Sequence, residues 1–144
     1  MSNDPVTTQE AQAARDAWKD AVESLDIERT VSLYDPERGR LLGTMDTGET
    51  TPRRSPERIR DYFESFLDKD ALRATFRHPV TEANLQQLGP GHAAHSGYYE
   101  FALSKGGRTQ VARATYTYVY GRAADGRLLI LTHNSGLTPE GIAE

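Results

Sequence analysis

The spacing of apolar residues changes along the chain. Up to Leu67 they recur mainly at three- and four-residue steps, whereas from Leu72 onward β-branched and aromatic residues dominate between turn residues. Helices followed by strands indicate an α+β fold in which one sheet covers the helices, because neither layer can bury its apolar face alone. The length of 144 residues fits a single domain over residues 1–144 with one hydrophobic core.

The first half of the chain carries clear helix signals. Thr7 and Glu10 form a capping-box pattern that predicts the start of the first helix. Asp26 can cap a second, short helix over residues 27–34, which Pro36 ends. The first helix shows apolar residues at helical spacing: Ala14, Trp18, Ala21, Val22 and Leu25.

A third helix is predicted after a short strand over residues 40–45 and a loop over residues 46–54, which we place near the mouth of a pocket. Ser55 supplies the N-cap and Pro56 the first helical position. Its apolar stripe consists of Ile59, Tyr62, Phe63, Phe66 and Leu67.

Four strands are predicted in the second half of the chain. Gly106-Gly107 and Asp125-Gly126 are typical of tight connections between strands. A long twisted sheet presents one curved face to the helices, and we expect a cone-shaped domain with a cavity where the layers diverge. The predicted strands span residues 72–84, 92–105, 108–122 and 127–136.

The charge distribution argues against nucleic acid as a partner. The formal net charge is −4, and a nucleic-acid-binding domain usually has a broad basic face with interleaved aromatic residues. The strongest basic cluster here is confined to one loop and helix start: Arg53, Arg54, Arg58 and Arg60.

The chain contains no cysteine, which excludes disulfides, thiolate zinc sites and a cysteine nucleophile. We expect a cytoplasmic protein without a membrane partner, because the first twenty residues have no apolar signal region and no later run is long enough to span a bilayer.

The last predicted strand carries two candidate functional residues. Alternation places His133 and Ser135 on one face, but it does not show which face lines the cavity. His133 can equally be a strand-end histidine bonded to the backbone. By the same alternation, Leu129 and Leu131 are expected on the face of His133.

Arg113 is a further candidate on the preceding strand, where it shares a face with Thr115 and Thr117. An arginine among apolar strand residues needs a partner, and Glu100 or Asp61 could supply it. Tyr62 lies on the inward stripe of the third helix, and Gly43 and Thr44 end the first strand.

Two common kinds of active site find little support. No Gly-x-Ser-x-Gly motif is present, and nothing places an acid behind His133, which argues against Ser-His-Asp catalysis. His92 and His95 stand three apart on a strand and face opposite sides, while His78 is isolated. We therefore expect no metal and no cofactor.

Six segments, taken in order, resemble the iota-class carbonic anhydrases. These enzymes belong to the nuclear transport factor 2-like superfamily, together with SnoaL-like proteins and the association domain of calcium/calmodulin-dependent protein kinase II. The segments are Leu33-Tyr34-Asp35-Pro36, Leu42-Gly43-Thr44, Ile59-Arg60-Asp61-Tyr62-Phe63, Ser96-Gly97-Tyr98-Tyr99-Glu100-Phe101, Ala112-Arg113-Ala114-Thr115-Tyr116-Thr117-Tyr118 and His133-Asn134-Ser135-Gly136-Leu137-Thr138-Pro139-Glu140.

The resemblance implies a cone-shaped nuclear transport factor 2-like fold that forms a homodimer or a higher homo-oligomer. It also implies that bicarbonate or carbon dioxide is held by the hydroxyls of Thr44, Tyr62 and Ser135, and some members of the family work without a metal. If the chain hydrates carbon dioxide, His133 could orient water or shuttle a proton, and we predict Arg113 as a further substrate-binding residue.

The final motif departs from the carbonic anhydrases. Their pattern ends as His-His-His-Ser-Ser-x-Met-Pro, whereas residues 132–139 read Thr-His-Asn-Ser-Gly-Leu-Thr-Pro. The kinase association domain instead carries His-x-Ser-Gly, which residues 133–136 satisfy.

These observations leave three hypotheses about function. The first is reversible hydration of carbon dioxide by a carbonic anhydrase, which is a lyase. The second is a non-catalytic module that oligomerises or binds a small ligand. The third is a polyketide-cyclase-like or ketosteroid-isomerase-like enzyme with Asp61, Glu82 or Glu100 as base.

Overall fold

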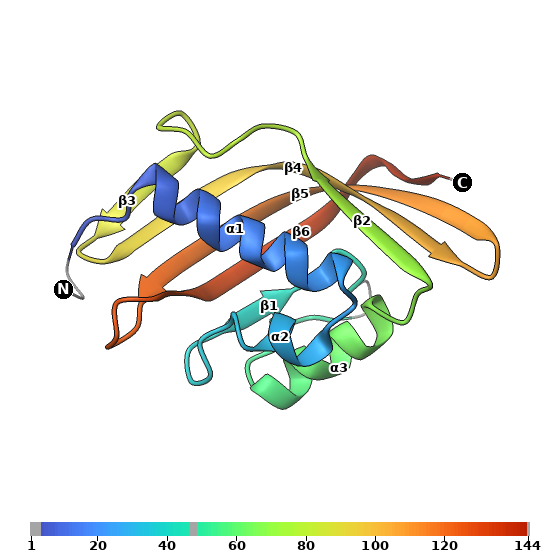
Figure 1. The fold of residues 1–144 in the computed structure, drawn as a ribbon, viewed down its shortest axis with the longest axis horizontal. Coiled ribbons are helices and arrows are strands. Elements are labelled where there is room, and N and C mark those ends of the chain that lie inside the picture. Colours follow the sequence, from blue (N-terminus) through green and yellow to red (C-terminus); the bar gives the residue numbers. More distant parts are fainter. Residues whose placement is uncertain (1–3, 47–48, 144) are drawn as a thin grey trace.

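The computed structural model describes residues 4–46 and 49–143, so residues 47 and 48 of the predicted loop lie outside the described residues. The elements follow the predicted order of two helices, a short strand, a third helix and then a run of strands (Figure 1). They are α1 (Thr8–Glu23), α2 (Ile27–Val31), β1 (Arg40–Leu42), α3 (Pro56–Phe66), β2 (Ala71–Phe76), β3 (Leu85–Gly89), β4 (His92–Lys105), β5 (Arg108–Arg122) and β6 (Leu128–Ala143).

The helix starts confirm the capping signals. The backbone N–H of Glu10 donates to the Thr7 hydroxyl at 3.0 Å, and the Thr7 N–H donates back to the Glu10 carboxylate at 3.0 Å. The prediction that the second helix extends to residue 34 is wrong. The helix α2 ends at Val31, because Tyr34 forms a parallel bridge with Ile130 of β6.

The strands form one sheet in the order β1-β6-β5-β4-β2, with β3 paired to β4 beyond the end of β2 (Figure 1). β1 runs parallel to β6, and the other pairs are antiparallel. The predicted bounds of β4 and β5 are confirmed, with Gly106 and Gly107 at positive φ in the turn between them.

The prediction of one strand over residues 72–84 is wrong in its second half, and β3 was not predicted. After Arg77, whose N–H still donates to the Tyr98 carbonyl of β4 at 2.9 Å, the chain leaves the sheet and bonds to α1: the His78 carbonyl accepts from Arg15, and the Val80 N–H donates to Gln12. Pro79 between them has no N–H to offer a ladder. β6 also runs on to Ala143 instead of ending at residue 136.

A β-bulge in β6 corrects the predicted alternation. The ladder with β5 shifts at Tyr120, which pairs with Ile130 and leaves Leu131 as the extra residue. Ile130 therefore shares the buried face of His133, whereas Leu131 lies against Gly121 on the other face.

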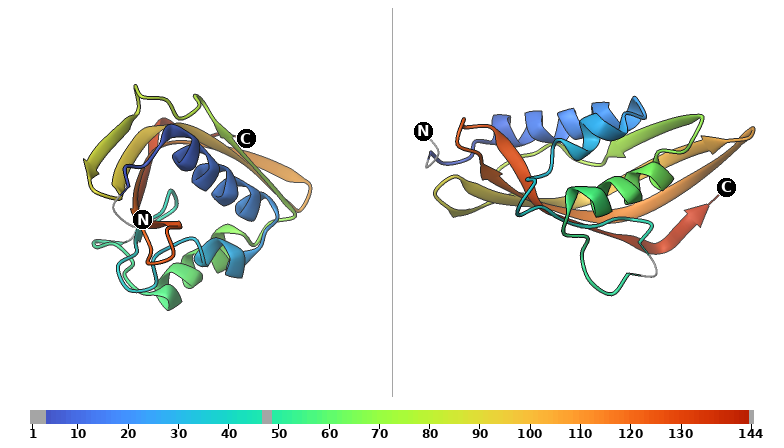
Figure 2. Two further views of the ribbon diagram at one scale, coloured as in Figure 1. Left: turned by 60° about the vertical axis from the view of Figure 1, so that its left-hand side comes forward. Right: turned by 90° about the horizontal axis from the view of Figure 1, so that it is seen from below.

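The helices lie together on one face of the curved sheet, and α1 runs across it (Figure 2). The core centres on Trp18 of α1, which is 1% exposed. Rings from both layers surround Trp18: Phe63, Phe76, Tyr99, Phe101, Tyr118 and His133. Among the described residues, no helix is both long enough and apolar enough to cross a membrane.

Candidate functional site

The strand pairing brings two of the predicted hydroxyls together. β1 lies parallel to β6 with Leu42 beside Asn134, and the next turn of chain carries Thr44 to Ser135. Their hydroxyl oxygens are 2.6 Å apart, although 91 positions separate them in the sequence. Thr44 is buried and Ser135 is half-buried.

Tyr62 of α3 reaches the same region. Its hydroxyl accepts a hydrogen bond of 3.2 Å from the backbone N–H of Met45, the residue after Thr44. Because that bond uses a lone pair, the phenolic proton of Tyr62 remains free to donate. Burial raises the pKa of Tyr62 well above its ordinary value, and the phenol therefore stays neutral.

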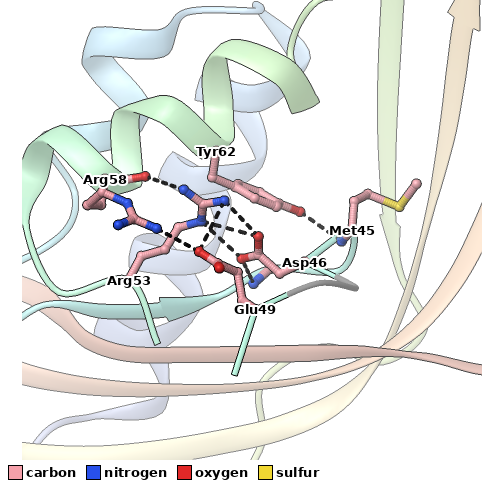
Figure 3. A network of polar contacts seen from close by, with 7 residues as sticks. Met45, Asp46, Glu49, Arg53, Arg58 and Tyr62 are labelled. Atoms are coloured by element: carbon pink, nitrogen blue, oxygen red, sulfur yellow. Dashed lines mark hydrogen bonds and ion pairs between the residues drawn. The ribbon is translucent and has the colours of Figure 1, made fainter. Parts of the chain in front are cut away.

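A network of charged side chains fixes the loop that carries Thr44 (Figure 3). The Asp46 carboxylate accepts from the Gly43 N–H at 2.9 Å and pairs with the Arg53 guanidinium at 3.0 Å. Arg53 also lies over the Tyr62 ring, 5.7 Å from its centroid. Glu49 extends the network to Arg58 at 2.8 Å. These contacts fix the position of the loop relative to α3.

Gly43 makes room for the Tyr62 ring, because a Cβ at this position would overlap the phenol. Gly43→Ala is therefore expected to displace Tyr62 and to lower the free energy of unfolding by about 1–3 kcal/mol, as overpacking usually does. Urea denaturation measures the change. Gly136→Ala is the matched control, since nothing lies within 4 Å of its Cβ. Equal stability of the two variants would contradict this assignment of Gly43.

His133 lies between two buried tyrosines. Its Nδ1 is 2.8 Å from the Tyr34 hydroxyl and its Nε2 is 3.1 Å from the Tyr99 hydroxyl. The indole N–H of Trp18, which can only donate, donates to Tyr34 at 3.1 Å. We therefore assign the Tyr34 proton to Nδ1 of His133, which leaves Nε2–H to donate to Tyr99.

The hydrogen bonds continue from Tyr99 to the hydroxyl pair. The Tyr99 hydroxyl lies 3.4 Å from Thr44 Oγ1, and Thr44 in turn contacts Ser135. When each group donates its hydrogen bond to the next, in the order His133, Tyr99, Thr44 and Ser135, the hydroxyl proton of Ser135 remains free to donate at the half-buried end of the series. Tyr62 and Ser135 then both present neutral donors.

Burial keeps His133 uncharged. The side chain is 2% exposed, and loss of solvation lowers its pKa to about 3, with a smaller contribution from His95. Both ring nitrogens already have tyrosine partners. In this arrangement, His133 has no nitrogen free to accept a proton from water.

The inner cavity is small, and no carboxylate is among the described residues that line it. The space among its side chains amounts to about 180 Å³, none of it wide enough for a water molecule. A ligand would therefore have to displace side chains to enter. The lining consists of Trp18, Gly43, Thr44, Tyr62, Phe63, Phe66, Tyr99, Phe101 and His133.

Arg113 does not join the inner site, the name we give to Thr44, Tyr62, His133 and Ser135 around the inner cavity. It pairs in register with Glu100, and both lie on the sheet face opposite Tyr99 and His133. Neither Glu100 nor Asp61 lies within ion-pair distance of Arg113 in the described part of the chain. Arg113 lines a separate space of about 590 Å³, which we call the outer hollow.

The three candidate acids also lie away from the inner cavity. Asp61 and Glu82 are exposed, on α3 and on the segment before β3, and Glu100 lines the outer hollow. Within residues 4–46 and 49–143, no group of three or more His, Asp or Glu side chains could hold a metal ion.

Two site residues, Tyr34 and Tyr99, were not predicted. Tyr34 precedes Asp35-Pro36 and Tyr99 follows Tyr98 in the motifs noted above. Alternation along β4 could have placed Tyr99 inside, whereas the contact of Tyr34 with His133 depends on the bridge to Ile130.

Comparison with known proteins identifies relatives of the chain. Residues 7–138 match the calcium/calmodulin dependent protein kinase II association domain family. A solved structure from Xanthomonas campestris, assigned to that association domain, is 30% identical and superposes with a TM-score of 0.78 over 97% of this chain and 98% of that chain. Among curated proteins, no match was found.

More distant structures share the fold alone. A ketosteroid isomerase-like protein from Erwinia carotovora atroseptica is 15% identical, with a TM-score of 0.70 over 91% of this chain and 96% of that chain. A Catenulispora acidiphila protein in complex with S-DNPA is 19% identical, with a TM-score of 0.70 over 90% and 91% of the two chains. The family match and the curved sheet over helices show that the chain belongs to the calcium/calmodulin dependent protein kinase II association-domain family, with a cone-shaped nuclear transport factor 2-like fold.

Proposed function

We propose that the chain is a self-associating module whose inner site binds a small hydrogen-bond acceptor without converting it. The observation that supports binding over catalysis is the engagement of both His133 nitrogens by Tyr34 and Tyr99. Catalysis of hydration or of proton abstraction needs a base near the reacting atom. The described residues that line the inner cavity offer neutral hydroxyl donors and no carboxylate.

The uncovered sheet face is the surface that we propose for self-association. Tyr98 there is 47% exposed. Around it, Arg77 and Arg113 lie with Glu100 and Glu140 along the outer hollow. Among the described residues none of these four side chains has an ion-pair contact, although Arg77 and Arg113 already attract Glu140, and the two cations and two carboxylates can pair with those of a second copy across a two-fold axis. The family to which the chain belongs supports the same proposal.

Sedimentation velocity at micromolar concentration tests self-association. We expect a mass of at least two chains, each of 16.0 kDa. Tyr98→Glu places a charge on this uncovered sheet face and should shift the mass toward one chain. Leu88→Glu is the matched control because Leu88, on β3, is 49% exposed. Dissociation by Leu88→Glu but not by Tyr98→Glu would show that another surface associates.

Carbonic anhydrase activity is the second candidate. The close contact of Thr44 with Ser135, beside Tyr62, favours it, because these are the hydroxyls that the resemblance assigns to bicarbonate. One well-placed oxyanion donor can lower a barrier by about 2.7–4 kcal/mol. We rank it second because no described residue lining the inner cavity offers a free base to activate water.

A further inference from the structure

Arg15 of α1 is a buried cation without an anionic partner among the described residues. The residue is 4% exposed. Its Nη1 donates to the His78 carbonyl at 2.8 Å and to the Tyr116 hydroxyl at 3.0 Å, and its guanidinium lies over Phe76, 4.3 Å from the ring centroid. Its Nε is buried and has no hydrogen-bond partner within residues 4–46 and 49–143.

This arrangement leaves a positive charge uncompensated. A guanidinium does not lose its proton in a protein, and a buried charge is costly unless an opposite charge meets it. Native structures seldom leave a buried donor unsatisfied, and an orphaned Nε therefore calls for a partner. The two neutral acceptors of Nη1 satisfy some of the hydrogen-bond donors of the guanidinium, but they do not neutralise its charge.

A hollow of about 340 Å³ lies beside Arg15, between α1 and β2, and we call it the α1–β2 hollow. Figure 1 shows β2 at the edge of the sheet next to the end of α1. Its lining has three cations, Arg15, Lys19 and Arg73, against two carboxylates, Asp16 and Glu23, which leaves one net positive charge.

Glu23 is already engaged at the rim of this hollow. Its carboxylate accepts from Lys19 Nζ at 3.0 Å and from the Ala74 N–H at 2.9 Å. Asp16 is exposed and accepts from the Gln12 side chain at 2.9 Å. Neither carboxylate forms an ion pair with Arg15.

The open edge of β2 supplies a further donor. The Ala74 N–H points away from β4 toward α1, as its bond to Glu23 shows. In an antiparallel pair, N–H groups two residues apart point to the same side. The Phe76 N–H therefore also faces the side on which Arg15 lies.

We propose that the α1–β2 hollow binds a compact oxyanion, a carboxylate or a phosphate group, anchored by Arg15. The anion would accept from the Arg15 Nε–H, for which the described residues offer no partner, and from the Phe76 N–H. Arg73 and Lys19 would add attraction at the rim. This site is separate from the inner cavity and does not depend on the function proposed there.

Titration of the ¹⁵N-labelled full chain tests the proposal, with inorganic phosphate and acetate as separate ligands and chloride holding the ionic strength constant. We expect saturable shifts of the Arg15 Nε–H and Phe76 N–H signals. Saturation by phosphate alone assigns a phosphate site, and saturation by acetate assigns a carboxylate site. The absence of saturable shifts with either ion would overturn the proposal.

Substitutions locate the binding to Arg15. Arg15→Met should lower the affinity about 10- to 100-fold, the range for hydrogen bonds to charged groups. Arg73→Gln, at the exposed rim, should fold normally and lower it about two- to fivefold. Arg127→Gln removes the same charge from the turn between β5 and β6 and should leave the affinity unchanged. An equal loss in Arg73→Gln and Arg127→Gln would refute the site.

Discussion

Replacing Trp18 by alanine is expected to lower the free energy of unfolding by about 3–5 kcal/mol, the usual cost of truncating a buried aromatic residue. Trp18 joins α1 to the sheet through rings of both layers, with the His133 ring at 5.3 Å and the Tyr118 ring at 5.9 Å between centroids. The substitution also removes the hydrogen bond to Tyr34. A loss of this size is a large fraction of the stability of a typical domain.

Urea denaturation followed by far-UV circular dichroism measures this effect, because Trp18 is the single tryptophan and its fluorescence is lost with it. Leu88→Ala is the control, since it truncates a large apolar side chain that is 49% exposed and lies away from the proposed self-association face, and it should change the stability by about 0.5 kcal/mol or less. A similar small change in Trp18→Ala would show that α1 is not anchored through this residue.

The stability of the fold is expected to fall steeply as the pH drops from 6.5 toward 4. Burial lowers the pKa of His133 to about 3 and that of His95 to about 4. In this range both imidazoles bind protons in the unfolded chain and not in the folded one. The contribution of the two neutral histidines to the free energy of unfolding is therefore complete above pH 6.5. As the pH falls below 6.5, each histidine lowers the free energy of unfolding by about 1.4 kcal/mol per pH unit.

Urea denaturation at several pH values between 7 and 5 measures the slope, which should be about 2–3 kcal/mol per pH unit at its lower end. His95→Gln and His133→Asn should each remove about half of it. A slope that neither substitution changes would mean that these histidines are not buried in the neutral form.

The sequence predicted those parts of the fold that local signals determine. The capping box at Thr7 and the Gly106-Gly107 turn set the start of α1 and the hairpin between β4 and β5, and both are confirmed. β3 lacks such a signal, because most of its side chains are exposed and do not alternate. The bulge at Leu131 depends on the pairing of β6 with β5, and the sequence of β6 alone does not indicate it.

The inner site could be predicted only in part. The resemblance singled out Thr44 and Ser135, and the structure brings their hydroxyls together. It did not indicate that Tyr34 and Tyr99 would occupy both nitrogens of His133. Tyr34 is separated from His133 by 99 positions in the sequence, and Tyr99 is separated from it by 34 positions. Arg113 was grouped with the hydroxyls because alternation does not show which sheet face the helices cover.

A stopped-flow assay of carbon dioxide hydration, with and without a chelator, tests most directly whether the inner site only binds. With both nitrogens of His133 engaged, we predict the same rate at micromolar protein as in buffer alone. A faster rate that Thr44→Ala and Tyr62→Phe both abolish, while the chelator has no effect, would contradict the proposed binding function.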